Sequence, residues 1–190
     1  GHGLGVIPEV TLTKSRSATG DWYFVTTVID GSVDYIILNA GDAKANGSAT
    51  ASTTSVFYSN YPNNQTVVAY NFASIPGFSK IGNYTGNGSA TAGPFVNLGF
   101  KPAFVMRKIT TGSGEWWMQD IARTPNNISK TALRANTSAA EVTSGDDSYG
   151  IDILSNGFRV FGAASYLNGN GQNYLYMAFA ESPFKTANAH

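Results

Sequence analysis

The side chains that most often carry out catalysis are few in this sequence and badly placed for it. His2 and His190 lie at the two ends of the 190-residue chain, whereas a Ser-His-Asp triad needs a histidine held in a packed interior. No cysteine is present to act as a nucleophile or a zinc ligand. Glycoside hydrolysis needs two carboxylates facing each other across a cleft, and none of the glutamates sits in a close acidic motif on one strand. These glutamates are Glu9, Glu115, Glu141 and Glu181. We therefore expect a protein that is not an enzyme.

An acidic stretch is the one place where a metal ion deserves consideration. Asp146 and Asp147, with Ser144 and Asp152 nearby, could supply oxygen ligands to Ca²⁺. A calcium loop usually alternates its acidic positions, however, and this stretch does not. We expect a solvated acidic loop and no cofactor.

Two loops rich in Asn, Tyr and Gly have the composition of recognition loops. Tyrosine offers rigid contact area, and Asn and Gln offer adaptable hydrogen bonds. The stretches are AASYLNGNGQN at 163–173 and YSNYPNNQT at 58–66. The candidate ligand-binding residues in them are Tyr166, Asn168, Asn170, Gln172, Tyr61 and Asn63. Two ordinary hairpin loops are the alternative interpretation.

Adjacent aromatic residues supply a further candidate. Trp116 and Trp117 follow each other, as do Trp22 and Tyr23. Neighbouring side chains on a strand point to opposite faces, so at most one of each pair enters a given core. Trp117 is the candidate for stacking on the face of a sugar ring. Because both copies keep the position, packing in the core or against a neighbouring subunit explains it more simply.

These residues are carried by a chain that contains an internal duplication. LGVIPEVTLTK at 4–14 recurs as LGFKPAFVMRK at 98–108, and Trp22 then falls on Trp116. VVAYNFA at 67–73 falls on YLYMAFA at 174–180. In between, Leu38-Asn39-Ala40 aligns with Leu133-Arg134-Ala135 after a slip of one residue. The second copy is longer, with its extra residues between about Ala140 and Asn173.

The duplication divides the chain into a first β repeat at 1–81 and a second at 94–190. The segment 82–93 is rich in Gly, Asn, Ser and Thr and is either a connection or, at Tyr84-Thr85-Gly86, the first strand of the second repeat. The repeats could form two small sandwiches in tandem or one sandwich with pseudo-two-fold symmetry. We favour one compact sandwich, because the connecting segment is short.

The composition and the local patterns predict an all-β fold with little helix. Hydrophobic residues make up 42% of the chain and aromatic residues 13%, while charged residues make up 13%, about half of the usual fraction of roughly 25%. Short β-rich runs occur throughout, among them 10–13, 22–28, 35–38, 56–58, 103–108, 116–120, 151–154 and 158–161. Ser155-Asn156-Gly157 predicts a hairpin with a type I′ turn. Single helical turns are expected at 42–45 and 138–142. The predicted architecture is a β-sandwich of the jelly-roll or lectin-like kind.

Charge and hydropathy limit the partners that we expect. The formal net charge is zero and no basic cluster is visible, which argues against binding to nucleic acid. No apolar run approaches the roughly 20 residues that a membrane-spanning helix needs. The chain begins Gly1-His2-Gly3 without a methionine, so we expect it to be a fragment or a processed piece.

Several phrases of the sequence resemble a domain found in tail-fibre and structural proteins of tailed bacteriophages, many of them marine. The resemblance is carried by GLGVIPEVTLTKSRSATGDW, by 67–108, by IDILSNGFRV and by YLYMAFAESPFKTANA. That domain tends to lie at the C-terminal end of longer chains. The resemblance implies a virion appendage or surface role and host-cell attachment, and it assigns no catalytic or binding residue.

Together these observations predict a non-enzymatic, extracellular virion domain that attaches to a receptor, with a host-surface glycan as the expected ligand. The partners that we expect are other virion subunits, in a homo-oligomer such as a trimer. The alternative is a purely structural virion module, either a capsid decoration or a filament-forming subunit.

Overall fold

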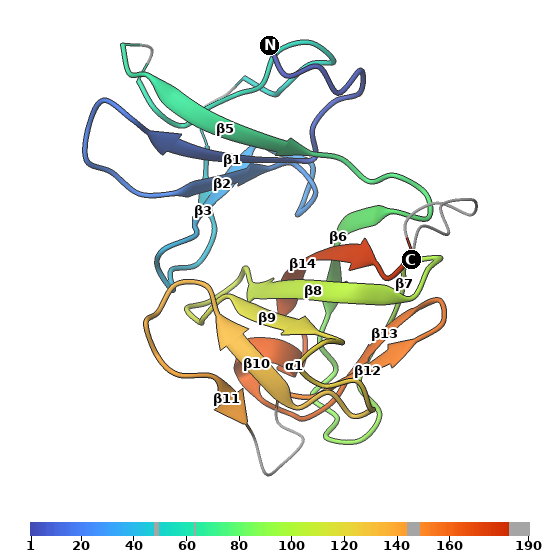
Figure 1. Cartoon of the computed structure of the whole chain (residues 1–190). Coiled ribbons are helices and arrows are strands. Elements are labelled where there is room, and N and C mark those ends of the chain that lie inside the picture. The colour runs from blue at the N-terminus through green and yellow to red at the C-terminus, as the bar shows by residue number, and fades with distance from the viewer. Residues whose placement is uncertain (48–49, 63, 144–148, 183–190) are drawn as a thin grey trace.

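The chain folds into antiparallel strands arranged in three sheets, so the predicted all-β sandwich with little helix is confirmed (Figure 1). The computed structural model describes residues 1–47, 50–62, 64–143 and 149–182. The first sheet has the order β4-β3-β2-β1-β5. Its strands are β1 (Val10–Ser15), β2 (Tyr23–Thr26), β3 (Asp34–Ile37), β4 (Ala45–Asn46) and β5 (Val67–Phe72).

The chain from Ser79 onward forms the other two sheets and a short helix. The second sheet has the order β11-β10-β9-β8-β14-β6, and the third has the order β12-β13-β7. The second sheet consists of β6 (Ser79–Thr85), β8 (Pro102–Ile109), β9 (Trp117–Asp120), β10 (Thr131–Arg134), β11 (Val142–Thr143) and β14 (Asn173–Ala180). The third consists of β7 (Phe95–Asn97), β12 (Ile151–Leu154) and β13 (Gly157–Val160), and the helix α1 spans Ser165–Asn168.

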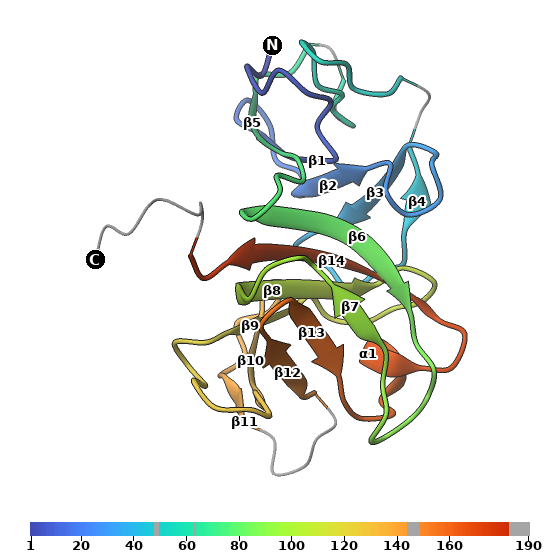
Figure 2. The ribbon, with the colours of Figure 1, turned by 90° about the vertical axis from the view of Figure 1, so that its right-hand side faces the viewer.

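The second sheet lies between the other two, so the molecule has three layers (Figure 2). Phe24 and Ile36 of the first sheet pack against Met106 and Met177 of the second in one core cluster. On the opposite face of the second sheet, another cluster joins its side chains to those of the third sheet, including Phe158. Each half of the chain therefore contributes one main sheet to a shared sandwich, and the third sheet covers the outer face of the second.

The two main sheets share one strand order, which supports the duplication read from the sequence. In both, a four-strand meander is followed by a last strand that returns to pair with the first, a Greek-key order. Val67 pairs with Ser15 in one sheet and Tyr174 pairs with Ile109 in the other, which matches the predicted alignment of the two final strands. The boundaries of the two repeats stay a prediction.

The strand register corrects one part of that alignment. Asn39 corresponds to Asn136, two residues beyond Arg134, the position that the sequence comparison gave it. The side-chain oxygen of Asn39 accepts a hydrogen bond from the backbone N–H of Trp22 at 2.7 Å, and Asn136 accepts the same bond from Trp116 at 3.0 Å. Each asparagine also donates to the preceding acid, Asp21 or Glu115. The sequence comparison missed this match because the loops between the strands differ in length.

Other local predictions have mixed outcomes. The hairpin between β12 and β13 is confirmed, with Leu154 paired to Gly157. Gly157 does not adopt positive φ, however; a Cβ there would lie 2.0 Å from the carbonyl oxygen of Val96, so a close approach between strands requires the glycine. The predicted strand at 56–58 and the predicted helical turns at 42–45 and 138–142 are wrong. The helix instead forms at 165–168, inside a stretch that composition marked as a loop.

Candidate functional site

Three aromatic rings gather at one end of the second sheet and line a pocket of about 320 Å³. The ring of Trp117 lies 4.6 Å from that of Tyr149 and 5.5 Å from that of Tyr166, measured between centroids. The rings of Trp117 and Tyr166 are nearly parallel, at 18°. Trp117 is buried, whereas both tyrosines are half-buried. We call this cavity the aromatic pocket; its lining is completed by Ser113, Gly114, Glu115, Arg134 and Ser165.

Polar groups accompany the rings. The guanidinium carbon of Arg134 lies 5.7 Å from the centroid of the Trp117 ring, within the range of a cation–π contact. The indole N–H of Trp117 and the Nε of Arg134 are buried and have no hydrogen-bond partner among the described residues. Buried donors of this kind nearly always have an acceptor. The pocket therefore combines apolar ring surface with two lining residues, Trp117 and Arg134, that each carry a buried N–H group without an acceptor among the described residues.

Strand alternation separates the two adjacent tryptophans as expected. Trp116 packs in the core between the two main sheets, where its indole N–H donates to the carbonyl oxygen of Ile37 at 3.0 Å. Trp117 belongs to a different cluster, with Leu167 of α1. Trp116 thus joins the two halves of the molecule, while Trp117 is left for the aromatic pocket.

Buried polar side chains fix the positions of both tyrosines. Arg107 and Gln119 each donate to the carbonyl oxygen of Tyr149, at 3.2 and 3.1 Å. The hydroxyl of Tyr84 donates to the carbonyl oxygen of Leu167 at 2.8 Å, and burial raises the pKa of that hydroxyl to about 12. The hydroxyl of Tyr174 donates to the carbonyl oxygen of Ser165. The backbone on either side of Tyr166 is therefore held by tyrosines from β6 and β14.

The sequence-predicted residues of the 163–173 loop have separate roles in the structure. Tyr166 lies in the aromatic pocket with Trp117. Asn168 does not, and this is a correction: its side chain is 0% exposed, accepts from Asn87 N–H at 3.0 Å and donates to the carbonyl oxygens of Ser89 and Gly162 at 2.9 and 2.8 Å. Asn168 closes the connecting segment onto the helix, so its amide is fully used in structure.

The remaining predicted residues lie outside the aromatic pocket. Asn170 is exposed on the turn after α1, and Gln172 accepts a hydrogen bond from Thr111 at 2.6 Å. Tyr61 packs edge-on against Tyr23, with 5.0 Å between ring centroids, and its hydroxyl donates to the carbonyl oxygen of Asp21. Tyr61 therefore fastens a loop to the first sheet. Asn63 lies outside the described residues, as do Asp146 and Asp147.

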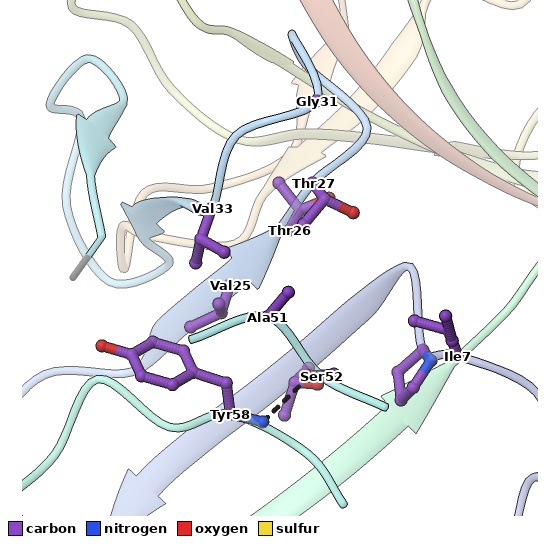
Figure 3. Close-up of a pocket in the computed structure, with 11 residues that line it drawn as sticks. Ile7, Val25, Thr26, Thr27, Gly31, Val33, Ala51, Ser52 and Tyr58 are labelled. Carbon is purple, nitrogen blue, oxygen red and sulfur yellow. Dashed lines mark hydrogen bonds between the residues drawn. The ribbon is translucent and has the colours of Figure 1, made fainter. Parts of the chain in front are cut away.

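A second pocket, of about 230 Å³, opens on the outer face of the first sheet (Figure 3). Val25 from β2 and Val33 line it together with Ile7 and Tyr58 from loops. Figure 3 shows the loop at 51–58 crossing the strands, where the backbone N–H of Tyr58 donates to the hydroxyl of Ser52 at 2.9 Å. Apart from Tyr58 and Ser52, its walls are mostly aliphatic and threonine side chains, and no charged side chain lines it among the described residues. It therefore offers less chemistry than the aromatic pocket.

Neither a cluster of metal ligands nor a membrane-spanning helix occurs among the described residues. Over 1–47, 50–62, 64–143 and 149–182, no three His, Asp or Glu side chains come together to hold a metal ion. No helix in those ranges has the length and apolarity to cross a bilayer. The Nε2–H of His2 donates to the carbonyl oxygen of Thr53 at 2.9 Å, and the Nδ1 of His2 accepts from the backbone N–H of Leu4 at 3.1 Å.

Sequence reasoning missed Tyr149 and Arg134, which complete the aromatic pocket. Both come from segments that composition did not single out, and only the fold brings them to Trp117. Compared with known proteins, the chain matches a family described as "domain of unknown function (DUF7483)" over residues 1–183. No curated protein and no solved structure matches it.

Proposed function

Because the chain belongs to the DUF7483 family, whose function is unknown, we propose a function from the aromatic pocket: it binds a glycan. In this proposal the protein is a non-enzymatic domain on the surface of a virion, such as a tail-fibre domain, that attaches to a host-surface glycan. The observation that carries the proposal is the combination of stacked rings with buried, unpartnered N–H groups on Trp117 and Arg134.

The chemistry of the aromatic pocket suits a sugar. The C–H face of a sugar ring packs on an aromatic ring, and its hydroxyl, carboxylate or acetamido oxygens accept hydrogen bonds. Tyr166 and Tyr149 offer half-buried rings, and the Trp117 and Arg134 N–H groups offer donors. The backbone bonds that fix both tyrosines reduce the ordering cost of binding.

The absence of catalysis is part of the proposal. Among the described residues that line the aromatic pocket, Glu115 is the single carboxylate, whereas glycoside hydrolysis uses a pair. Its Oε2 accepts a hydrogen bond from Asn136, which engages it in the Trp116 motif shared by both halves.

A glycan array with the purified chain tests the proposal. We expect binding to a restricted set of glycans, and a loss of at least about tenfold, or about 1.4 kcal/mol, on Tyr166→Ala. Phe95→Ala is the matched control, because Phe95 is an exposed aromatic residue on β7, outside the aromatic pocket. Circular dichroism of both variants checks that the fold is retained. Absence of binding above background, or equal binding by wild type and Tyr166→Ala, would refute the proposal.

A structural role in the virion is the second candidate, and one observation favours it. The first sheet ends in an uncovered strand, β5, which carries the exposed ring of Tyr70. Exposed edge strands are sites at which chains associate.

A further inference from the structure

The last strand of each repeat has a different environment in the two halves of the molecule. In the second sheet, β14 lies between β8 and β6, and β6 runs antiparallel to it from Ser79 to Thr85. In the first sheet, β5 pairs with β1 on one side and forms the edge on the other. In Figure 1, β5 is the outermost strand of its sheet. Within the part of the chain that the structure describes, the first sheet therefore has no counterpart of β6.

Side-chain burial also differs between the two equivalent strands, β14 and β5. Met177 of β14 is 4% exposed, and in the register of β6 it lies opposite Ile81. The equivalent residue of β5 is Tyr70, which is 52% exposed. No residue of β5 is fully buried, whereas Tyr174–Ala178 of β14 all are. The last strand of the repeat is thus an interior, buried strand in the second sheet and an exposed edge strand in the first.

The backbone of β5 is open in the same way. Along an edge strand, the backbone N–H and C=O groups of alternate residues bond to the neighbouring strand, and those of the residues in between point away from the sheet. Arg16 N–H donates to the carbonyl oxygen of Thr66, so the outward groups of β5 belong to Val67, Ala69 and Asn71. By that alternation and the register with β1, the N–H groups of Ala69 and Asn71 point away from β1, on the side of β5 where the sheet ends.

The sequence of β5 does not protect this edge. Natural edge strands are usually blocked by lysine, proline, bulges or a short length. The six residues of β5, VVAYNF, contain no charge, no proline and no glycine, and they pair with β1 without a shift in register. Such a strand is a template for adding another.

We propose that the β5 edge binds one extended peptide segment, antiparallel to β5, in the position that β6 occupies on β14. The segment places an apolar side chain over Tyr70, as Ile81 is placed over Met177. It needs no glycine opposite Ala69. In β6 the residue opposite Tyr176 of β14 has to be a glycine, Gly82, because a Cβ there would lie 2.7 Å from the Tyr176 hydroxyl. The residue of β5 equivalent to Tyr176 is Ala69, whose small side chain leaves that space open.

β6 itself supplies the probe that tests this proposal. A capped peptide of residues 77–86, GFSKIGNYTG, is titrated into the ¹⁵N-labelled chain, and amide exchange is measured with and without it. We expect saturable binding, with at least tenfold slower exchange at Ala69 and Asn71. Tyr70→Lys, which places a charge under the added strand, should weaken binding at least tenfold. Ala69→Pro, which removes an outward N–H and leaves the β1 ladder intact, should do the same.

Matched controls separate this edge from other surfaces. Phe95→Lys changes an exposed aromatic residue on a different edge strand, β7, and should leave binding unchanged. No saturable binding, or binding unaffected by both β5 variants, would overturn the proposal. So would protection confined to Tyr176 and its neighbours in β14, or a β5-mediated dimer in sedimentation without peptide, because the occupant would then be a second copy.

Discussion

Lys108 of β8 is buried where the two halves of the molecule meet, and its burial predicts how the stability of the fold depends on pH. The side chain is 0% exposed, and its Nζ donates to the carbonyl oxygen of Ile109 at 2.8 Å. Burial lowers the pKa of Lys108 to about 8, and the nearby carboxylates of Asp42 and Glu115 oppose this only in part. At about 1.36 kcal/mol per pKa unit the shift is worth at most about 3 kcal/mol, and solvent screening reduces it to about 2.

The sign follows from proton linkage. Between pH 8 and 10.5 the unfolded chain holds the Lys108 proton more tightly than the folded one, so this residue's contribution to stability rises with pH. Lys108→Met removes that contribution. We expect the free energy of unfolding of the variant minus that of wild type to be about 2 kcal/mol larger at pH 7 than at pH 10.5, so that the variant is relatively more stable at the lower pH. The lost bond to Ile109 lowers stability at both pH values and cancels in this difference.

Urea unfolding at both pH values, followed by tryptophan fluorescence, measures the effect. Lys14→Met is the matched control, because Lys14 is the equivalent residue of the first repeat, is half-buried and donates to the carbonyl oxygen of Ser15 in the same way. If wild type and Lys108→Met show parallel stability from pH 7 to 10.5, the argument from burial is refuted.

Three further substitutions test the structure. Asn168→Ala should lower stability by about 2–4 kcal/mol, because it leaves several buried groups unpaired, and thermal unfolding measures it. Gly93→Ala should cost at least about 3 kcal/mol, because a Cβ would lie 2.1 Å from the carbonyl oxygen of Val160; a normal melting temperature would contradict the close approach. Trp116→Phe should lower stability in urea unfolding by about 1–3 kcal/mol, because the hydrogen bond to Ile37 is lost and the ring is smaller. An unchanged urea midpoint would contradict the role of Trp116 in joining the two main sheets.

The sequence predicts much of the sandwich because its strands carry local signals. The β-rich runs mark β1, β8 and β14, and the recurring phrases reveal the shared strand order. In the third sheet the sequence predicts the hairpin of β12 and β13 but not the third strand, β7. β7 is three residues long, and its partner β13 lies far along the chain. Its existence depends on long-range packing that no local pattern specifies.

Only part of the candidate site could be predicted, because residue type is visible in the sequence and long-range packing is not. Trp117 and Tyr166 stand out by residue type, and the structure brings them together. Asn168 stands out equally, yet its amide bonds to backbone groups, and composition cannot distinguish an amide that faces solvent from one that closes a loop. Tyr149 and Arg134 carry no signal in the sequence, because their places in the aromatic pocket depend on Arg107, Gln119 and the β9–β10 pairing.

The three tryptophan indoles test the central claim directly, because each reports on a different environment. Titration of ¹⁵N-labelled protein with the best glycan from the array should shift the indole N–H signal of Trp117, which lines the aromatic pocket. The signal of Trp116 should stay in place, because its N–H is bonded to Ile37 inside the core. A shift of the Trp22 indole with that of Trp117 unmoved would place the ligand elsewhere and contradict the account.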